Sequence, residues 1–179
     1  VMGVLYGAQA CVPAIKEHGE GGWVLNVASM AGMMGMPYAA AYCASKAAVV
    51  SMTESWVPEL KPFGIHTSVL CPAFVKTRIH ESYRNRQQKY AVAAEKRINK
   101  EKLKAGAQAA TKAVESGIDA SVLAERVIEA LQSEQTYIYT HPNYRKVTTA
   151  RFSAIDSAFV DAEQSQAVGH LIDDEIVTF

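Results

Sequence analysis

Asn26 to Lys46 reads N-V-A-S-M-A-G-M-M-G-M-P-Y-A-A-A-Y-C-A-S-K, and it contains a serine, a tyrosine and a lysine that one reaction could use. Tyr42 and Lys46 are four residues apart, so in a helix their side chains lie on one face, one turn from each other. A neighbouring cation favours the phenolate form of a tyrosine, which otherwise forms only near a pH of about 10. Ser29 would act as a fixed hydrogen-bond donor. The stretch therefore predicts an acid–base site made of Ser29, Tyr42 and Lys46.

The residues around Ser29 predict a strand, a loop and a helix that meet at one point. Residues 23–28 form a short, largely apolar run after two glycines, which is typical of a buried strand, and Ser29 follows it directly. Residues 39–60 have apolar side chains at helical spacing. Open α/β sheets bind ligands at the carboxyl ends of their strands, so the predicted strand places Ser29 at a ligand-binding edge.

The rest of the chain predicts an α/β fold. Gly64 suits the left-handed residue that closes the helix before it. A strand that follows would deliver Pro72 to Thr77 to the same sheet edge as Ser29. The remaining elements are recognised by β-prone composition or by helical apolar spacing, and they are strands at 65–70 and 136–140 and helices at 1–18, 119–131 and 143–159.

The composition is that of an ordinary globular protein, with 49% hydrophobic and 20% charged residues. The formal net charge is zero, which gives no electrostatic reason to expect nucleic acid or an anionic membrane as a partner. No apolar run reaches the roughly 18 residues that span a bilayer, and no signal peptide opens the chain. A soluble cytoplasmic protein is therefore expected.

The cysteines and histidines predict neither a disulfide nor a metal site. Cys11, Cys43 and Cys71 are odd in number, widely spaced and set among apolar residues, so we interpret them as reduced thiols in the core. The five histidines form no close-spaced pair that could bind a metal. Ser29 does not lie in a G-x-S-x-G motif, which argues against a serine hydrolase.

Three signatures, in order along the chain, resemble the short-chain dehydrogenase/reductase family. N-V-A-S ends at Ser29, Tyr42 follows thirteen residues later, and Lys46 completes a Y-x-x-x-K motif. Residues 64–73, G-I-H-T-S-V-L-C-P-A, resemble the family's strand after the tyrosine helix, and residues 74–77, F-V-K-T, continue its P-G-x-V-x-T segment. The resemblance implies the C-terminal part of a doubly wound, Rossmann-type parallel sheet with flanking helices.

This resemblance implies an oxidoreductase that uses NAD or NADP to interconvert an alcohol and a ketone by hydride transfer. In the oxidation direction Tyr42 would accept the hydroxyl proton, Ser29 would hold the substrate oxygen, and Lys46 would bind the nicotinamide ribose. Reduction reverses these roles. The resemblance does not distinguish NAD from NADP, because the residues by which the family selects between them precede the residues of this chain.

The resemblance also implies cofactor contacts beyond Tyr42 and Lys46. The backbone near Pro72 and Val75 would lie at the nicotinamide end, and the Thr77 hydroxyl would face the carboxamide or the phosphates. Ala73 stands where the family usually has glycine.

The domain organisation expected from the resemblance is a single partial Rossmann-type domain over residues 1–179. Nothing in the chain matches the family's glycine-rich cofactor turn, and a helix that starts uncapped at the first residue suggests that a longer chain was cut. Residues 78–117 are charged, which is usual for a solvated helix face, and their position implies a mobile lid over the substrate. The helices at 1–18 and 39–60 are expected to pack against their copies in a homodimer or homotetramer.

Two other interpretations stay open. A nucleotide-sugar epimerase or dehydratase shares Y-x-x-x-K, although the segment P-A-F-V-K-T argues against it. Alternatively, the chain is a non-catalytic fragment that acts only in oligomerisation, because three parallel strands without the rest of their sheet leave an apolar edge and would bind dinucleotide poorly. Several methionines suit either a core or an adaptable apolar pocket wall, namely Met30, Met33, Met34 and Met36.

Overall fold

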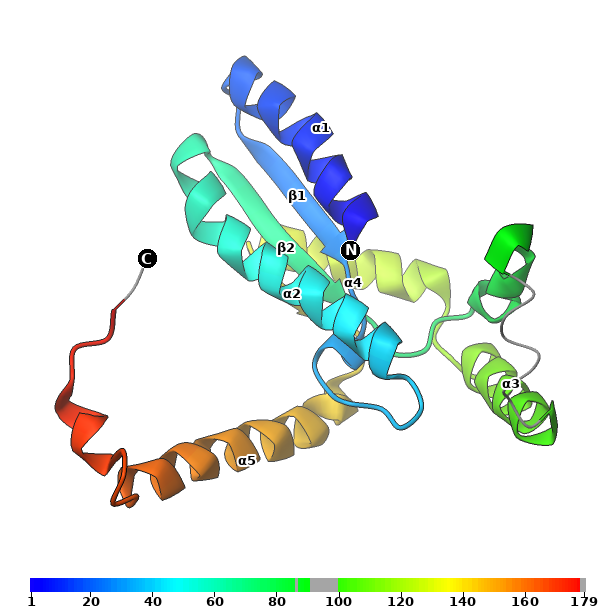
Figure 1. The fold of residues 1–179 in the computed structure, drawn as a ribbon. Helices are drawn as coiled ribbons and strands as arrows, with labels where there is room; N and C mark the ends of the chain where they lie inside the picture. The colour runs from blue at the N-terminus through cyan, green and yellow to red at the C-terminus, as the bar shows by residue number, and fades with distance from the viewer. Residues whose placement is uncertain (86, 91–99, 178–179) are drawn as a thin grey trace. The chain divides into compact units, whose positions relative to one another are not determined.

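The computed structural model describes residues 1–85, 87–90 and 100–177. They fall into two compact units, residues 1–140 and residues 141–179. The first unit contains a sheet of three parallel strands in the order β1-β2-β3 (Figure 1), which are β1 Gly22–Val27, β2 Ile65–Cys71 and β3 Tyr137–Tyr139. These strands confirm the three predicted ones to within one residue at each end, and they confirm the α/β fold.

The strand register brings the functional segments to one edge. Val27 pairs with Leu70, and Leu70 pairs with Ile138, so the three strands reach their carboxyl ends side by side. β2 lies in the centre and is almost wholly buried, which explains its continuous run of apolar and small side chains. β1 is an edge strand in the described part of the sheet, and its Trp23 and Val27 side chains are exposed.

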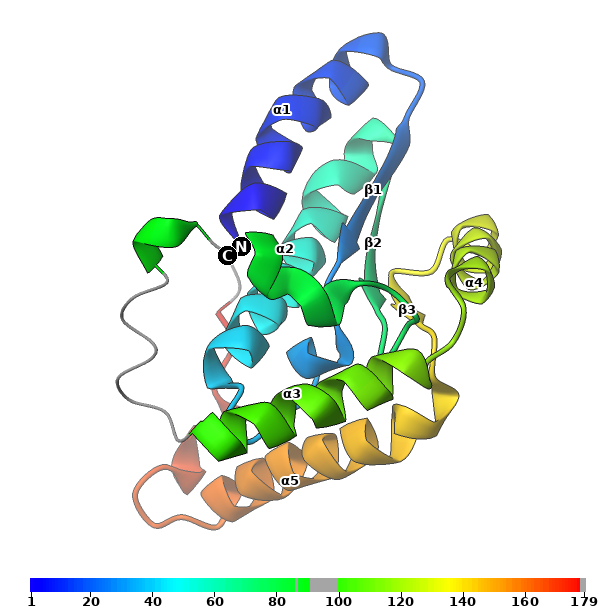
Figure 2. The same ribbon diagram turned by 90° about the vertical axis from the view of Figure 1, so that its right-hand side faces the viewer.

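Helices cover both faces of the sheet. The helices α1, Met2–His18, and α2, Ala40–Leu60, lie on one face, and α4, Ala120–Gln132, lies on the other (Figures 1 and 2). All three confirm predicted helices. α2 buries Val49, Val50 and Thr53. The opposite face has a cluster in which Leu70, Ala130 and Ile138 are buried against partly buried neighbours, namely Leu25, Leu123, Val127 and Leu131.

Gly21 and Gly64 make the turns at the other end of the strands possible. Both have φ near +70°, at 73° and 67°, which is the left-handed region that glycine adopts without strain. A Cβ on Gly21 would lie 2.6 Å from the Gly64 carbonyl oxygen, so only glycine fits there. Gly64 closes the short 3₁₀ turn after α2, as the sequence predicts.

Cys11 corrects one prediction. Cys43 and Cys71 are buried as expected, but Cys11 is exposed, so it is not a core thiol. The reason is that α1 buries none of its residues within the described chain. Apolar spacing in α1 therefore marked a helix correctly but did not mark a buried face.

The segment between β2 and α4 begins at the carboxyl end of β2. An isolated parallel bridge joins Val75 to Ile118, and between them lie the short 3₁₀ helices η3, Ile79–Asn85, and η4, Gln88–Tyr90, and the helix α3, Lys100–Glu115. Residues 86 and 91–99 of the expected lid at 78–117 lie outside the described residues. The lid itself stays a prediction.

The second unit consists of η5, Pro142–Tyr144, α5, Arg145–Glu163, and η6, Gly169–Asp173. α5 confirms the helix predicted at 143–159.

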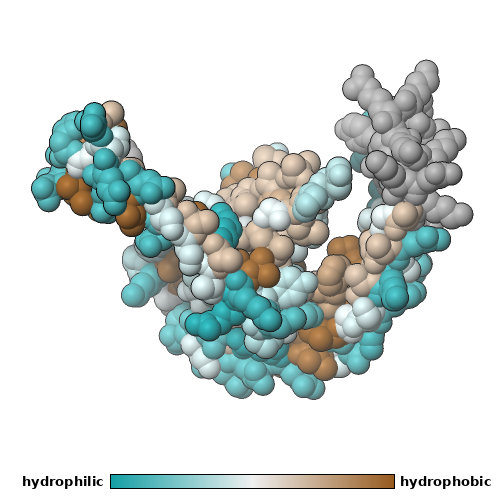
Figure 3. Space-filling view, turned by 90° about the horizontal axis from the view of Figure 1, so that it is seen from below, coloured by the Kyte–Doolittle hydropathy of each residue, from teal (hydrophilic) through white to brown (hydrophobic). Residues whose placement is uncertain are grey.

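Figure 3 shows apolar side chains in separate patches among hydrophilic ones on one face of the molecule. Among the described residues, no helix is both long enough and apolar enough to cross a bilayer.

Candidate active site

Ser29 lies at the carboxyl end of β1 and caps the 3₁₀ turn η1, Met30–Gly32. Its side-chain oxygen accepts a hydrogen bond from the Ala31 N–H at 3.1 Å. The N–H of Met30, the residue after Ser29, donates a hydrogen bond to the Pro72 carbonyl at 2.9 Å. The segments that leave β1 and β2 are therefore tied together, as predicted from the shared sheet edge.

Tyr42 and Lys46 lie one turn apart near the start of α2. The Lys46 Nζ is 5.9 Å from the centroid of the Tyr42 ring, within reach of a favourable cation–π interaction. The same Nζ donates a hydrogen bond to the Val27 carbonyl at 3.1 Å. Because Val27 is two residues before Ser29, this bond joins the helix that carries Tyr42 to the strand end that carries Ser29.

Gly32 sets how closely η1 and α2 approach. A Cβ at this position would lie 2.8 Å from the Lys46 carbonyl oxygen, a distance that real Cβ atoms do not tolerate against backbone. The absence of a side chain on Gly32 therefore allows the turn after Ser29 to rest on the backbone of Lys46.

The Tyr42 side chain is open to a ligand. It is 43% exposed. Within residues 1–85, 87–90 and 100–177, no side chain or backbone group forms a hydrogen bond with its hydroxyl. The phenol is thus accessible to an incoming oxygen atom.

Cys71, the last residue of β2, is a neighbour of Lys46 that the sequence analysis did not place in the site. Burial raises the pKa of the Cys71 thiol to about 11, although a hydrogen bond from the Ser29 backbone and the charge of Lys46 act in the opposite direction. Burial also lowers the pKa of the Lys46 ammonium below its usual value, an effect that Cys71 opposes. The thiol therefore stays neutral near pH 7 and adds no charge beside Lys46.

Backbone hydrogen bonds tie the predicted cofactor segment to Ile118, just before α4. Ile118 N–H donates to the Phe74 carbonyl at 3.1 Å, and Lys76 N–H donates to the Ile118 carbonyl at 2.9 Å, on either side of Val75. Thr77 is exposed, and its hydroxyl oxygen accepts a hydrogen bond from the Ile79 N–H at 3.3 Å. Pro72, Val75 and Thr77 thus follow β2 in one continuous, anchored segment.

A buried polar pair, also missed by the sequence analysis, locks β1 to α2. The Asn26 side-chain amide donates to the Thr53 hydroxyl at 3.0 Å, and that hydroxyl donates to the Val49 carbonyl at 2.7 Å. Thr53 is completely buried and Asn26 is 8% exposed. An asparagine inside an apolar strand is the sequence signal that points to such a pair, because a buried amide requires a partner.

The arrangement offers an accessible phenol, an ammonium and a serine hydroxyl at one sheet edge. In the described ranges, no group of three histidine, cysteine, aspartate or glutamate side chains could hold a metal ion. The chemistry that these side chains support is proton transfer with stabilisation of an oxygen atom.

Comparisons with known proteins agree on one family. Residues 1–88 match the short chain dehydrogenase family. The chain is 30% identical over 157 residues to the CLA biosynthesis dehydrogenase/reductase of Lactiplantibacillus plantarum, and the match covers 87% of this chain and 55% of that protein. It is also 30% identical over 153 residues to the C alpha-dehydrogenase of Sphingobium sp., and this match covers 86% of this chain and 48% of that protein.

Solved structures give the same result. The short chain dehydrogenase/reductase from Burkholderia phymatum, crystallised in complex with NAD, superposes with a TM-score of 0.80 at 34% sequence identity. The match covers 88% of this chain and 56% of that one. The chain therefore spans about half the length of the relatives that it matches.

Proposed function

The chain belongs to the short-chain dehydrogenase/reductase family, and on that premise we propose that the whole protein is an NAD(P)-dependent oxidoreductase that interconverts an alcohol and a ketone. The observation that supports this most is the hydrogen bond from Lys46 to the Val27 carbonyl. It holds the helix of Tyr42 against the strand end of Ser29.

Ser29 would hold the substrate oxygen. Its side-chain oxygen already accepts a hydrogen bond from the Ala31 N–H, which fixes the position of the hydroxyl group. A serine hydroxyl has one proton to donate, and accepting a bond leaves that proton available. Ser29 can therefore donate to the oxygen of an alcohol or a ketone.

Tyr42 would move the proton. In oxidation its phenol oxygen accepts the proton of the substrate hydroxyl, and in reduction it returns a proton to the ketone oxygen. Lys46 lies close enough for its charge to act on the Tyr42 ring. The nicotinamide cofactor, when bound, accepts or donates the hydride.

The anchored segment after β2 fits a nicotinamide carboxamide. In a parallel bridge the residues that flank the bridged one make the hydrogen bonds, so Val75 itself directs its N–H and C=O away from Ile118. No hydrogen bond from the described residues reaches these two groups. A carboxamide has both a carbonyl acceptor and N–H donors, so it can pair with both. Pro72, Val75, Thr77, Tyr42 and Lys46 would hold the cofactor.

The backbone at Ala73 supports the same use of this segment. Ala73 does not have a positive φ, so alanine replaces the family's usual glycine without strain in the left-handed region.

A homodimer or homotetramer is also part of the proposal. α1 buries no residue within the described chain, which leaves it a surface that a second copy could cover. A light-scattering mass equal to one subunit of the full-length protein would count against this. The cytoplasmic location stays a prediction, which imaging of the tagged protein would test.

The test is turnover by the full-length protein. Purified protein is mixed with NAD(H) or NADP(H) and a panel of secondary alcohols and ketones, and the absorbance of the reduced nicotinamide is followed. The proposal predicts turnover with at least one pair. Failure across a chemically broad panel, for a protein that binds the dinucleotide, would contradict it and favour the non-catalytic alternative.

A further inference from the structure

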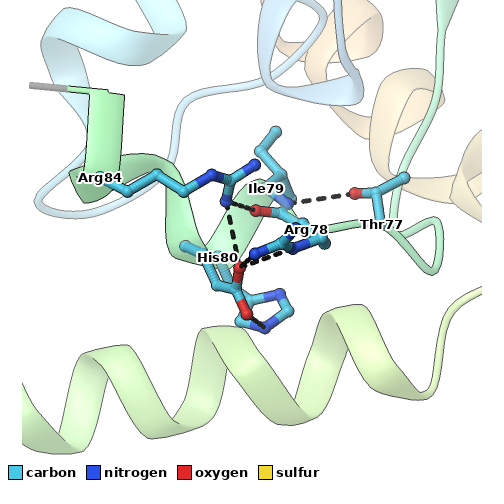
Figure 4. Close-up of polar contacts among 6 residues, drawn as sticks. Thr77, Arg78, Ile79, His80 and Arg84 are labelled. Atoms are coloured by element: carbon cyan, nitrogen blue, oxygen red, sulfur yellow. Dashed lines mark hydrogen bonds and ion pairs between the residues drawn. The ribbon is translucent and has the colours of Figure 1, made fainter.

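Two arginines share one carboxylate directly after Thr77, and we call this group the arginine clamp, Arg78, Glu81 and Arg84. The Glu81 Oε2 accepts from the Arg78 Nε and lies against the Arg78 Nη2, both at 2.7 Å. The Arg84 Nη1 reaches the same oxygen at 3.2 Å and also donates to the Arg78 carbonyl at 3.0 Å. Figure 4 shows the Arg84 side chain extending back along η3 toward Arg78.

The arginine clamp has one positive charge in excess, because one carboxylate faces two guanidinium groups. The Arg78 side chain is 73% exposed and that of Arg84 is 41% exposed. A guanidinium has five N–H donors, and the contacts that the structure describes use only some of them in each arginine. The clamp therefore presents fixed, accessible donors and a net positive charge.

The position of the arginine clamp is set by the anchored segment before it. Arg78 follows Thr77 directly, and the Val75–Ile118 bridge and an ion pair between Lys76 and Asp119 at 2.9 Å hold the segment in place. The segment itself begins at the carboxyl end of β2, and ligands of open α/β sheets bind at that end of the strands. Ser29 and Lys46 lie at this same edge.

Stability alone is a poor reason for this arrangement. An exposed ion pair typically stabilises a protein by no more than about 1 kcal/mol. A second guanidinium on the same carboxylate adds repulsion between two cations. A rigid pair of arginines is, in contrast, what recognition of a carboxylate or phosphate requires, because planar guanidinium groups pair with both oxygens.

We infer that Arg78 and Arg84 bind a carboxylate or phosphate group of the substrate, so that the enzyme acts on an anionic alcohol or ketone. This inference rests on the proposed function. Glu81 acts as a positioning residue that keeps the two guanidinium groups at a fixed separation. A phosphate of the cofactor offers the same chemistry, so the experiment has to separate the two sources.

The experiment uses the full-length protein saturated with its dinucleotide, and keto acids of increasing chain length together with their uncharged amides. Calorimetric titration measures binding of each acid and each amide, and turnover is followed with the same compounds. We expect at least one acid to bind more tightly than its amide by about 10-fold or more, the factor that a charge-assisted hydrogen bond provides. Arg78→Gln and Arg84→Gln should each remove most of that preference.

Arg145→Gln is the matched control, because it removes the same charge from an exposed arginine in the second unit. It should leave the preference for acids unchanged. Binding of NAD(H) and NADP(H) to the two clamp variants is measured separately and should also be unchanged.

Three results would overturn the inference. The first is that the wild-type protein binds acids and amides equally. The second is that both clamp variants keep the preference for acids. The third is that the variants weaken dinucleotide binding while the preference persists, which would assign the arginines to a cofactor phosphate. Because the titration does not depend on turnover, it separates failure of this inference from failure of the proposed reaction. If the protein binds acids more tightly than amides but reduces no compound of the panel, only the proposed reaction is contradicted.

Discussion

Lys46 donates a hydrogen bond from its ammonium to the carbonyl of Val27 at 3.1 Å, and this contact joins helix α2 to the end of strand β1. The ammonium is partly buried, and this burial lowers its pKa. A buried cation costs folding free energy while its hydrogen bond returns some, so we expect Lys46 to contribute to catalysis more than to stability.

Lys46→Met tests this balance in the full-length protein. Turnover should fall by about 100-fold or more, because acid–base catalysis contributes at least that factor. The free energy of unfolding at pH 7 should change by less than about 1 kcal/mol, because the cost of a buried charge and a hydrogen bond are removed together. The folded-state pKa is lowered, so the stability cost is present at neutral pH and disappears as pH rises through that pKa to the ordinary lysine value of about 10.5. A variant that keeps wild-type turnover would remove Lys46 from the mechanism.

Thr53→Val tests the buried bond between Asn26 and Thr53. The substitution keeps the shape but leaves the Asn26 amide without its acceptor, which should cost about 1–3 kcal/mol in urea unfolding. The double variant Asn26→Leu with Thr53→Val removes both polar partners and should recover most of the loss. Additive losses in the double variant would show that the two side chains do not interact.

Gly117→Ala tests the anchor of the cofactor segment. A Cβ there would lie 2.4 Å from the Phe74 carbonyl oxygen, so the backbone has to move and the bridge at Val75 breaks. We expect a loss of about 1–3 kcal/mol, as for overpacking, and weaker dinucleotide binding by fluorescence titration. Gly7→Ala is the stability control, because no atom lies within 4 Å of its Cβ position. Equal stability of the two variants would contradict the anchor.

The strands, the helices and the order of the site segments could be predicted from the sequence, because apolar periodicity and glycine turns are local signals. Contacts between distant segments could not. The bond from Lys46 to Val27, the pair of Asn26 and Thr53, and the position of Cys71 beside Lys46 depend on how α2 packs on the sheet.

The exposed thiol of Cys11 shows the same limit, because an apolar helical pattern does not state which face another element covers. The charged residues after Thr77 predict a solvated helix face. The contact of both Arg78 and Arg84 with the Glu81 carboxylate could not be predicted from the sequence. It depends on the 3₁₀ helix η3, which brings the three side chains together.

Tyr137 gives a pH-dependent test of the side-chain hydrogen bond between β3 and α2. Its hydroxyl donates to the Glu54 Oε1 at 2.5 Å, and this bond, with burial, raises the pKa of Tyr137 to about 12. The folded state thus holds the proton more tightly than the unfolded state, with a pKa of about 10. The stabilisation is fully present below about pH 10 and is lost as pH rises through about 12. Unfolding of Tyr137→Phe should therefore depend less on pH in this range than that of the wild type. Parallel curves for the two proteins would contradict the bond.

The most direct measurement for the proposed reaction is the turnover number of full-length Tyr42→Phe, compared with wild type and with Tyr6→Phe, which removes an exposed hydroxyl on α1. Loss of the acid–base hydroxyl should lower turnover by about 100-fold to 10,000-fold, with the melting temperature retained. Tyr6→Phe should match the wild type. Turnover of Tyr42→Phe within about twofold of wild type, far below the effect of losing a general acid, would show that another group moves the proton.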